Sequence, residues 1–264
     1  MSSTKNIWAE LYSQIPKEVL DKILCRTELY DRIGPIELPL RIFFQEVQEP
    51  VKFILYYFGF YESGENYFLL TQKESLKFDN PIVRVSSNCN WAFDLRSMRC
   101  DCEWELEYAK KMVSEEPEQD GLIIFALDQH GKSIPGKIRG HALLYALGQI
   151  QKQDLVYGAY LKNGFDIDYR NYNEVCNILK SLNITKMRLL TNNPDKIKAF
   201  QQCGYEVTRL PIEKPYSRHD SEELGVKKIK LGHHLELGNF NRDDISIYDL
   251  DPNKVFNESG GVDE

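Results

Sequence analysis

Three cysteines lie close together in the sequence and can bind a metal ion. Cys89, Cys100 and Cys102 form a C-x10-C-x-C pattern directly after a strand-like run. Thiolates bind zinc, and three of them leave one position of a tetrahedral ion open for water. Such a site favours hydrolysis, since structural zinc sites usually close the shell with a fourth protein ligand. The same pattern also fits inert buried thiols, so spacing alone leaves both interpretations open.

A second group of residues is suited to phosphate. Residues 191–196 are predicted to lead from the end of a strand into a helix, where free backbone N–H groups and the helix dipole favour an anion. Asn193 can cap this helix, Pro194 suits its first position, and Lys196 adds a mobile charge. The alternative is a well-capped helix whose lysine faces solvent.

Asp168 and Arg170 place a carboxylate two residues before a guanidinium. A carboxylate can accept a proton during hydrolysis, and a guanidinium is a forked, permanently charged group that suits phosphate. The same residues also fit the start of a helix, with Asp168 as the N-cap and Arg170 in solvent.

The elements that must position these residues predict an α+β protein. Runs rich in β-branched and aromatic residues, separated by turn residues, predict an antiparallel N-terminal sheet at 36–47, 51–61, 67–71 and 82–86. After the cysteines, alternation of helix and strand predicts a mixed α/β half. Its expected helices are 104–115, 137–151, 170–182 and 194–203, and its expected strands are 122–127, 187–191 and 206–210.

Both ends of the chain differ from this body. Residues 1–26 are predicted to be a helical extension whose apolar stripe docks on the body, and residues 236–264 an acidic, mobile tail. The net charge of −7 argues against nonspecific nucleic-acid binding. No apolar stretch approaches the roughly 20 residues that span a bilayer. With no targeting signal, we expect a cytoplasmic protein with reduced cysteines and no disulfide framework.

Several motifs together resemble the GTP cyclohydrolase II family of riboflavin synthesis. They occur in the family's order at residues 84–89 (RVSSNC), 97–102 (SMRCDC), 168–172 (DYRNY), 188–194 (RLLTNNP) and 227–233 (KKIKLGH). The resemblance covers residues 27–235 and implies that this part is the catalytic domain, with the family's α+β fold.

The resemblance also implies roles. The three cysteines match the family's ligands for one Zn²⁺ per chain, Asp168 matches its general base, and Arg170 matches the arginine that acts on the α-phosphate. Positions that hold substrate correspond to Arg84, Thr191 and Lys196. The implied reaction opens the imidazole ring of GTP, loses C8 as formate and releases pyrophosphate. Mg²⁺ is expected with the phosphates, and the family forms homodimers.

Other positions depart from the family. Ser86 and Asn88 replace its His and Glu, and Glu105 replaces a substrate-contacting glutamine. His130 and Lys132 stand where the family has the acidic residue that reads the base and a closing arginine, and a threonine of another segment is lost within 154–160. His141 replaces the catalytic tyrosine; it can transfer protons near neutral pH or simply form part of the site wall.

These departures leave alternatives to GTP hydrolysis. The protein can be a diverged relative that opens the base of a uracil nucleotide or another purine nucleotide, because altered donors and acceptors reject the original base. It can stop at the formamide because the tyrosine is absent. It can also be a nucleotide-binding protein without turnover, although the retained cysteines, Asp168 and Arg170 argue against that.

Overall fold

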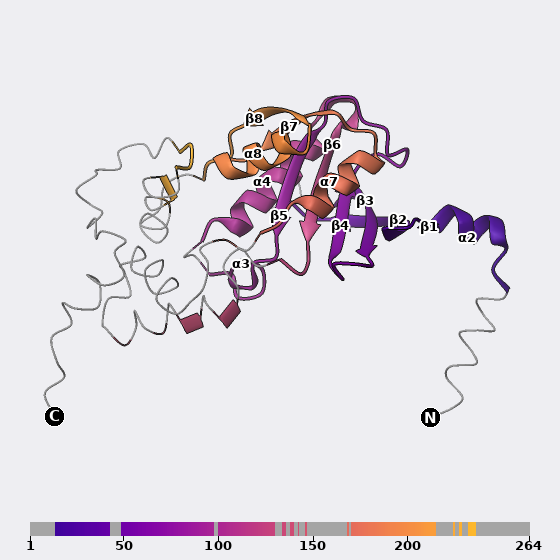
Figure 1. Ribbon diagram of the computed structural model, residues 1–264, viewed down its shortest axis with the longest axis horizontal. Coiled ribbons are helices and arrows are strands. Elements are labelled where there is room, and N and C mark those ends of the chain that lie inside the picture. Colours follow the sequence, from indigo (N-terminus) through magenta and orange to yellow (C-terminus); the bar gives the residue numbers. More distant parts are fainter. Residues whose placement is uncertain are drawn as a thin grey trace, which may run out of the picture.

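A computed structural model gives the structure of residues 14–42, 49–97, 100–129 and 170–214, together with short pieces at 134–135, 138–139, 142, 146, 168, 224, 227–228 and 232–235. An eight-stranded mixed sheet organises these residues, in the order β1-β2-β3-β4-β6-β5-β7-β8 (Figure 1). The strands are β1 Leu24–Arg26, β2 Tyr30–Leu40, β3 Val51–Phe60, β4 Asn66–Thr71, β5 Ile82–Ser87, β6 Gly121–Ala126, β7 Lys186–Leu190 and β8 Glu206–Leu210. The helices are α2 Lys17–Ile23, α3 Asn90–Phe93, α4 Cys102–Ser114, α7 Asn173–Ser181 and α8 Pro194–Gln202, with the 3-10 turn η1 Pro117–Gln119.

The sheet has an antiparallel part and a parallel part. Strands β1 to β4 pair antiparallel in sequence order, and β4 pairs antiparallel with β6. Strand β5 is parallel to both of its neighbours, β6 and β7, and β7 is parallel to β8. The prediction that residues 82–86 belong to the antiparallel part was therefore wrong. After β5, helix α4 carries the chain back to the end of the sheet at which β5 began, so β6 runs in the same direction as β5.

Helices cover both faces of the parallel part. On one face, α7 and α8 pack on β5, β6 and β7 through residues such as Ile178 and Phe200, both fully buried. On the other face, α4 packs through Leu106, Ala109 and Val113. Alternate strand residues enter each core, which is why these strands are apolar on both sides.

Most of the predicted elements are present within a few residues of the expected positions. The helix expected at 194–203 is α8, and the Asn193 side chain caps it by accepting from the backbone N–H groups of Asp195 and Lys196. The helix expected at 170–182 begins later, at Asn173. The helix expected at 137–151 lies largely outside the described residues, as do residues 43–47 of the first predicted strand.

The described part of the N-terminal extension differs from its prediction. Leu24–Arg26 form β1 and not the end of a helix, because they pair with Asp31–Ile33 on the edge of the sheet. None of the residues of α2 is buried, and its Val19 is 44% exposed, so its apolar stripe is not docked on the described body. Residues 1–13 and the acidic tail 236–264 lie outside the described residues.

One disulfide links Cys176 of α7 to Cys203 at the end of α8. This corrects the prediction of reduced cysteines throughout. The two residues are 27 positions apart in sequence, and they meet because both helices pack on the same face of the sheet. Cys25 and the three clustered cysteines form no disulfide. Within the described part of the chain, every helix falls short of the length and apolarity needed to cross a membrane.

Candidate metal and phosphate site

The carboxyl ends of β5 and β7 form the point where the chain topology reverses. From β5 the chain passes through α4 to β6 on one side, whereas from β7 it passes through α8 to β8 on the other. In open α/β sheets, ligands bind in the crevice outside such a pair of strand ends. Those residues singled out in the sequence that fall within the described part of the chain lie around these two strands.

The three clustered cysteines meet at this edge. Their Sγ atoms all lie within 4.8 Å of one another, and those of Cys89 and Cys100 are 3.9 Å apart. Cys89 comes two residues after the end of β5, and Cys102 is the first residue of α4. The adjoining thiols of Cys100 and Cys89, together with burial, raise the pKa of Cys102 well above its usual range. A cation would reverse that effect by stabilising the thiolates, and a set of three sulfur donors suits zinc.

Asp101 lies between two of these cysteines and is held by Lys227, the first residue of the 227–233 motif. Asp101 is 5% exposed, and its carboxylate accepts a hydrogen bond from Lys227 Nζ at 2.7 Å. Burial is the largest influence and by itself would raise the pKa of Asp101, but the Lys227 ammonium, a backbone N–H and the Arg84 charge together hold the pKa below its usual value. The sequence pointed to the 227–233 motif without indicating this contact. The two residues are 126 positions apart, so no local sequence pattern could have predicted that they pair.

Arg84 of β5 is buried and paired. Its Nη2 donates to Glu105 Oε2 at 2.6 Å, and its Nη1 donates to the Leu190 carbonyl at 3.1 Å. The Arg84 Nε atom is buried and has no partner among the described residues. Glu105 lies one turn after Cys102 on α4, so this ion pair connects the thiol cluster to the end of β7.

Lys196 is also buried, with 5% of its surface exposed. Its Nζ donates to the Val85 carbonyl at 2.9 Å. Burial, followed by the charges of Arg84 and Arg170, lowers the pKa of Lys196 well below its usual value. Neither a lysine in solvent nor a mobile charge describes it, because α8 packs its first turn against β5. Thr191 is buried as well, and its Oγ1 accepts from the Asn193 N–H at 3.1 Å.

Asp168 and Arg170 form an ion pair that precedes α7. Arg170 Nε donates to Asp168 Oδ1 at 2.8 Å, and Arg170 Nη2 donates to Oδ2. Although burial would raise the pKa of Asp168, Arg170 lowers it on balance. The N-cap of α7 is Tyr172, so Asp168 does not cap this helix. The simple helix-start interpretation of the two residues is therefore wrong.

Gln129 is a positioning residue that the sequence did not single out. Its Nε2 donates to the Asn171 carbonyl at 2.8 Å and to Tyr67 Oη at 3.1 Å. Its Oε1 accepts from the Asn171 N–H at 3.3 Å, and its own carbonyl accepts from the Asn88 N–H at 3.1 Å. Gln129 thus connects the loop after β6 to the segments before Cys89 and after Arg170. The sequence feature that could have indicated Gln129 is its position three residues after the end of β6.

Two further titratable residues lie near these charges. The Tyr172 hydroxyl is buried without a partner in the described structure, and burial raises its pKa. His233 is half-buried, and burial, followed by the charges of Lys227 and Arg170, lowers its pKa to about 4. Three other candidates, His130, Lys132 and His141, lie outside the described residues, so their predicted roles stay predictions.

Comparison with known proteins shows which family the sequence matches. The family model described as GTP cyclohydrolase II matches residues 45–210. The chain is 35% identical over 183 residues to the GTP cyclohydrolase-2 of Shewanella halifaxensis, covering 68% of this chain and 83% of the relative. It is 37% identical over 174 residues to the riboflavin biosynthesis protein RibBA of Aquifex aeolicus, covering 65% of this chain. The match spans 41% of that longer relative, and also 41% of RibBA of Cytophaga hutchinsonii.

Proposed function

The chain belongs to the GTP cyclohydrolase II family, and we propose that it is a hydrolase that opens the ring of a nucleotide base, with GTP the default substrate. In this proposal the imidazole ring is opened, C8 leaves as formate, and pyrophosphate is released. The observation that carries the proposal is that three thiols and the buried side chains of Arg84 and Lys196 lie around the carboxyl ends of the central strands β5 and β7. Residues 27–235 are proposed as the catalytic domain, acting as a homodimer as the family does.

The thiol cluster is proposed to hold one Zn²⁺ per chain. Cys89, Cys100 and Cys102 supply three sulfur donors, which suit zinc and leave room for a further ligand. Zinc bound there supplies Lewis-acid activation of water. The Asp101–Lys227 ion pair fixes the backbone between two of the donors. Contacts of this kind orient metal ligands in proteins.

Phosphate binding is assigned to the buried cations, one of them at the start of α8. Lys196, in the first turn of α8, lies near Arg84 and Arg170, whose charges act on it. The N–H groups of Asp195 and Lys196 are already bonded to the Asn193 side chain, so the side-chain cations supply the phosphate contacts in this proposal. Gathering cations in a buried site costs free energy unless an anion joins them. A nucleotide triphosphate, accompanied by Mg²⁺, would provide that anion.

Proton transfer is assigned to Asp168. Arg170 holds its pKa low, so the group is a carboxylate at neutral pH and can accept a proton. When a phosphate draws Arg170 N–H donors away, the carboxylate loses its partner, its pKa rises, and it becomes a stronger base. Substrate binding and base activation are therefore linked through one ion pair.

A second candidate substrate is a nucleotide with another base, such as uracil or another purine. The observation that favours it is the carboxylate of Glu105, which stands where the family has an amide and is 2.6 Å from Arg84. An acceptor-only group cannot read a base as an amide does. Ser86, Asn88 and His130 are further departures. Arrest at the formamide, linked to His141, and nucleotide binding without turnover complete the alternatives.

The test is product analysis by mass spectrometry. Zinc-replete protein is incubated with GTP, other purine nucleotides, UTP and UMP. A ring-opened product from GTP supports the main proposal, and the presence or absence of formate separates full reaction from arrest at the formamide. If another nucleotide is converted and GTP is not, that nucleotide is the substrate. Binding without any product from any nucleotide would contradict the hydrolase assignment.

A further inference from the structure

A few buried polar side-chain atoms of the described residues have no hydrogen-bond partner. Among the described residues, the buried side-chain atoms that lack a hydrogen bond are Arg84 Nε, Asn90 Oδ1 and Tyr172 Oη. Arg84 belongs to β5, Asn90 follows Cys89, and Tyr172 stands at the N-cap position of α7 without a capping side-chain bond. A buried polar group without a partner costs free energy, so proteins rarely keep one without a reason. A bound ligand would supply the missing partners.

Tyr172 has the clearest surroundings of the three. Its ring packs against Phe200, with ring centres 5.5 Å apart, and Lys196 Nζ lies 5.7 Å from the centre of its ring. The charges that act on the hydroxyl are those of Arg170, Asp168, Arg84 and Asp195, with Arg170 the strongest. Two arginines from different segments therefore act on the unpartnered hydroxyl, and Lys196 lies over the ring that carries it.

We propose that the Tyr172 hydroxyl donates a hydrogen bond to a phosphate oxygen of the bound nucleotide, beside Arg170 and Lys196. This inference rests on the proposed function, because it concerns the same substrate. Tyr172 is then a substrate-binding residue in addition to those that the sequence singled out.

The chemistry of the hydroxyl fits this role. Burial raises the pKa of Tyr172, so the phenol keeps its proton and can donate it to an anionic oxygen. A neutral donor adds affinity without adding to the repulsion among the three cations. Hydrogen bonds to charged oxygens are about twice as strong as those between neutral groups.

The hydroxyl contributes no hydrogen bond to the described fold, so its removal separates binding from stability. Tyr172→Phe keeps the ring that packs on Phe200 and deletes only Oη. Tyr205 offers a matched control, because it contacts the same Phe200 ring and its hydroxyl donates to the Cys176 carbonyl at 2.7 Å. Tyr205→Phe therefore removes a structural hydrogen bond on the same face of the sheet.

The experiment measures ligand affinity by calorimetry on zinc-loaded protein, with pyrophosphate and Mg²⁺, GMP and guanosine as probes. For Tyr172→Phe we expect affinity for pyrophosphate or GMP to fall about tenfold, affinity for guanosine to stay unchanged, and the Tm not to fall. For Tyr205→Phe we expect a lower Tm and wild-type affinity for all three probes.

The outcomes separate this inference from the proposed function. If Tyr172→Phe binds both phosphate probes as the wild type does, or if the wild type binds neither, the inference is overturned. If only guanosine affinity falls, Tyr172 contacts the base, and the phosphate role is wrong. If phosphate affinity falls while the wild type converts no nucleotide, the inference holds and the hydrolase proposal fails.

Discussion

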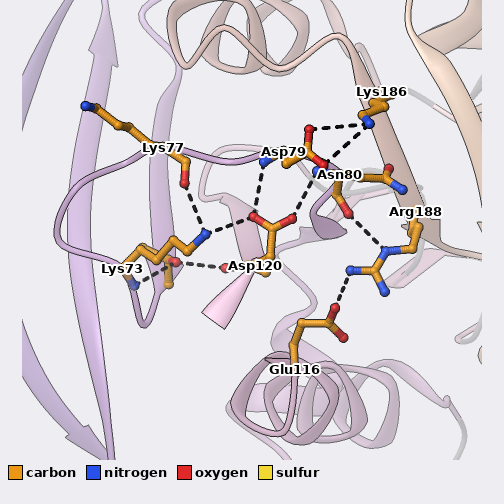
Figure 2. A network of polar contacts seen from close by, with 10 residues as sticks. Lys73, Lys77, Asp79, Asn80, Glu116, Asp120, Lys186 and Arg188 are labelled. Atoms are coloured by element: carbon orange, nitrogen blue, oxygen red, sulfur yellow. Dashed lines mark hydrogen bonds and ion pairs between the residues drawn. The ribbon is translucent and has the colours of Figure 1, made fainter. Parts of the chain in front are cut away.

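The two ends of the parallel strands differ in how completely their buried polar atoms are paired. At the amino ends, Asp120 accepts from Lys73 Nζ at 3.1 Å and from the Asn80 N–H at 3.0 Å, just before β6 begins (Figure 2). Arg188 of β7 donates to the Asn80 carbonyl at 3.0 Å and pairs with Glu116. At the carboxyl ends, Arg84 Nε and Tyr172 Oη lack partners among the described residues.

This difference indicates which end serves stability and which serves binding. Polar groups that the protein pairs internally hold loops in place, as the Asp120 network holds residues 79–80 to the start of β6. Polar groups that are buried and left open lower stability unless a ligand joins them. Substitutions at the two ends should therefore have different consequences, which the following predictions exploit.

The largest effect is expected from Cys100→Ser at the carboxyl end. Removing one thiolate should abolish zinc binding and ring opening together, because the two remaining sulfur atoms bind zinc much more weakly. Metal content by mass spectrometry and product formation from GTP measure both. Cys25→Ser is the matched control, since Cys25 forms no disulfide and lies in the edge strand β1, away from the thiol cluster. Full zinc content in Cys100→Ser would contradict the assigned metal site.

Arg170→Ala should come next in size. We expect pyrophosphate release to fall at least about 100-fold, because a charged donor to the phosphate is lost, while zinc content stays at the wild-type level. A coupled assay for pyrophosphate gives the rate. The control is Arg26→Ala, which removes an exposed arginine paired with Asp31 at 3.4 Å. Normal pyrophosphate release by Arg170→Ala would remove the assigned role.

At the amino end, Asp120→Ala should affect stability and not chemistry. The carboxylate is largely buried, and its loss deprives the N–H groups of Asp79 and Asn80 of this acceptor and leaves Lys73 with the Lys77 carbonyl. We expect the free energy of unfolding in urea to fall by about 2 kcal/mol, with kcat unchanged. Asp79→Ala, whose side chain is 88% exposed, should cost less than about 0.5 kcal/mol. A large loss of kcat in Asp120→Ala would contradict the division between the two ends.

The smallest effect concerns pH at the carboxyl end. The pKa of His233 is about 4 in the folded protein, below its ordinary value of about 6.5, so the unfolded chain binds more protons between these pH values. The free energy of unfolding should therefore fall as the pH drops from about 6.5 to 4. In His233→Gln this fall should be about 1 kcal/mol smaller, after allowance for partial exposure. Identical pH curves for His233→Gln and the wild type would refute this.

The adjacent residue provides the control for that measurement. His234 is exposed, and its backbone N–H bonds to the Asn192 carbonyl at 2.9 Å, which a side-chain change preserves. We expect His234→Gln to follow the wild-type curve. Chemical denaturation at fixed pH values gives all three curves.

Local patterns were sufficient for elements whose signals are themselves local. The start of α8 was predicted from Asn193 and Pro194, because a cap acts on N–H groups two or three residues away. Strand β5 was predicted as a strand but assigned to the wrong part of the sheet. Its residues specify an extended chain, whereas the direction of its neighbours depends on the crossover through α4.

The sequence by itself determined the elements, the grouping of the three cysteines and the family motifs. The tertiary structure alone decided that Lys196 is buried, that Lys227 holds Asp101, and that the Tyr172 hydroxyl lacks a partner in the described structure. The physical reason is that burial and pairing arise between residues far apart in the chain. Lys227 and Asp101 are separated by 126 positions, and the order of the strands determines whether such residues meet.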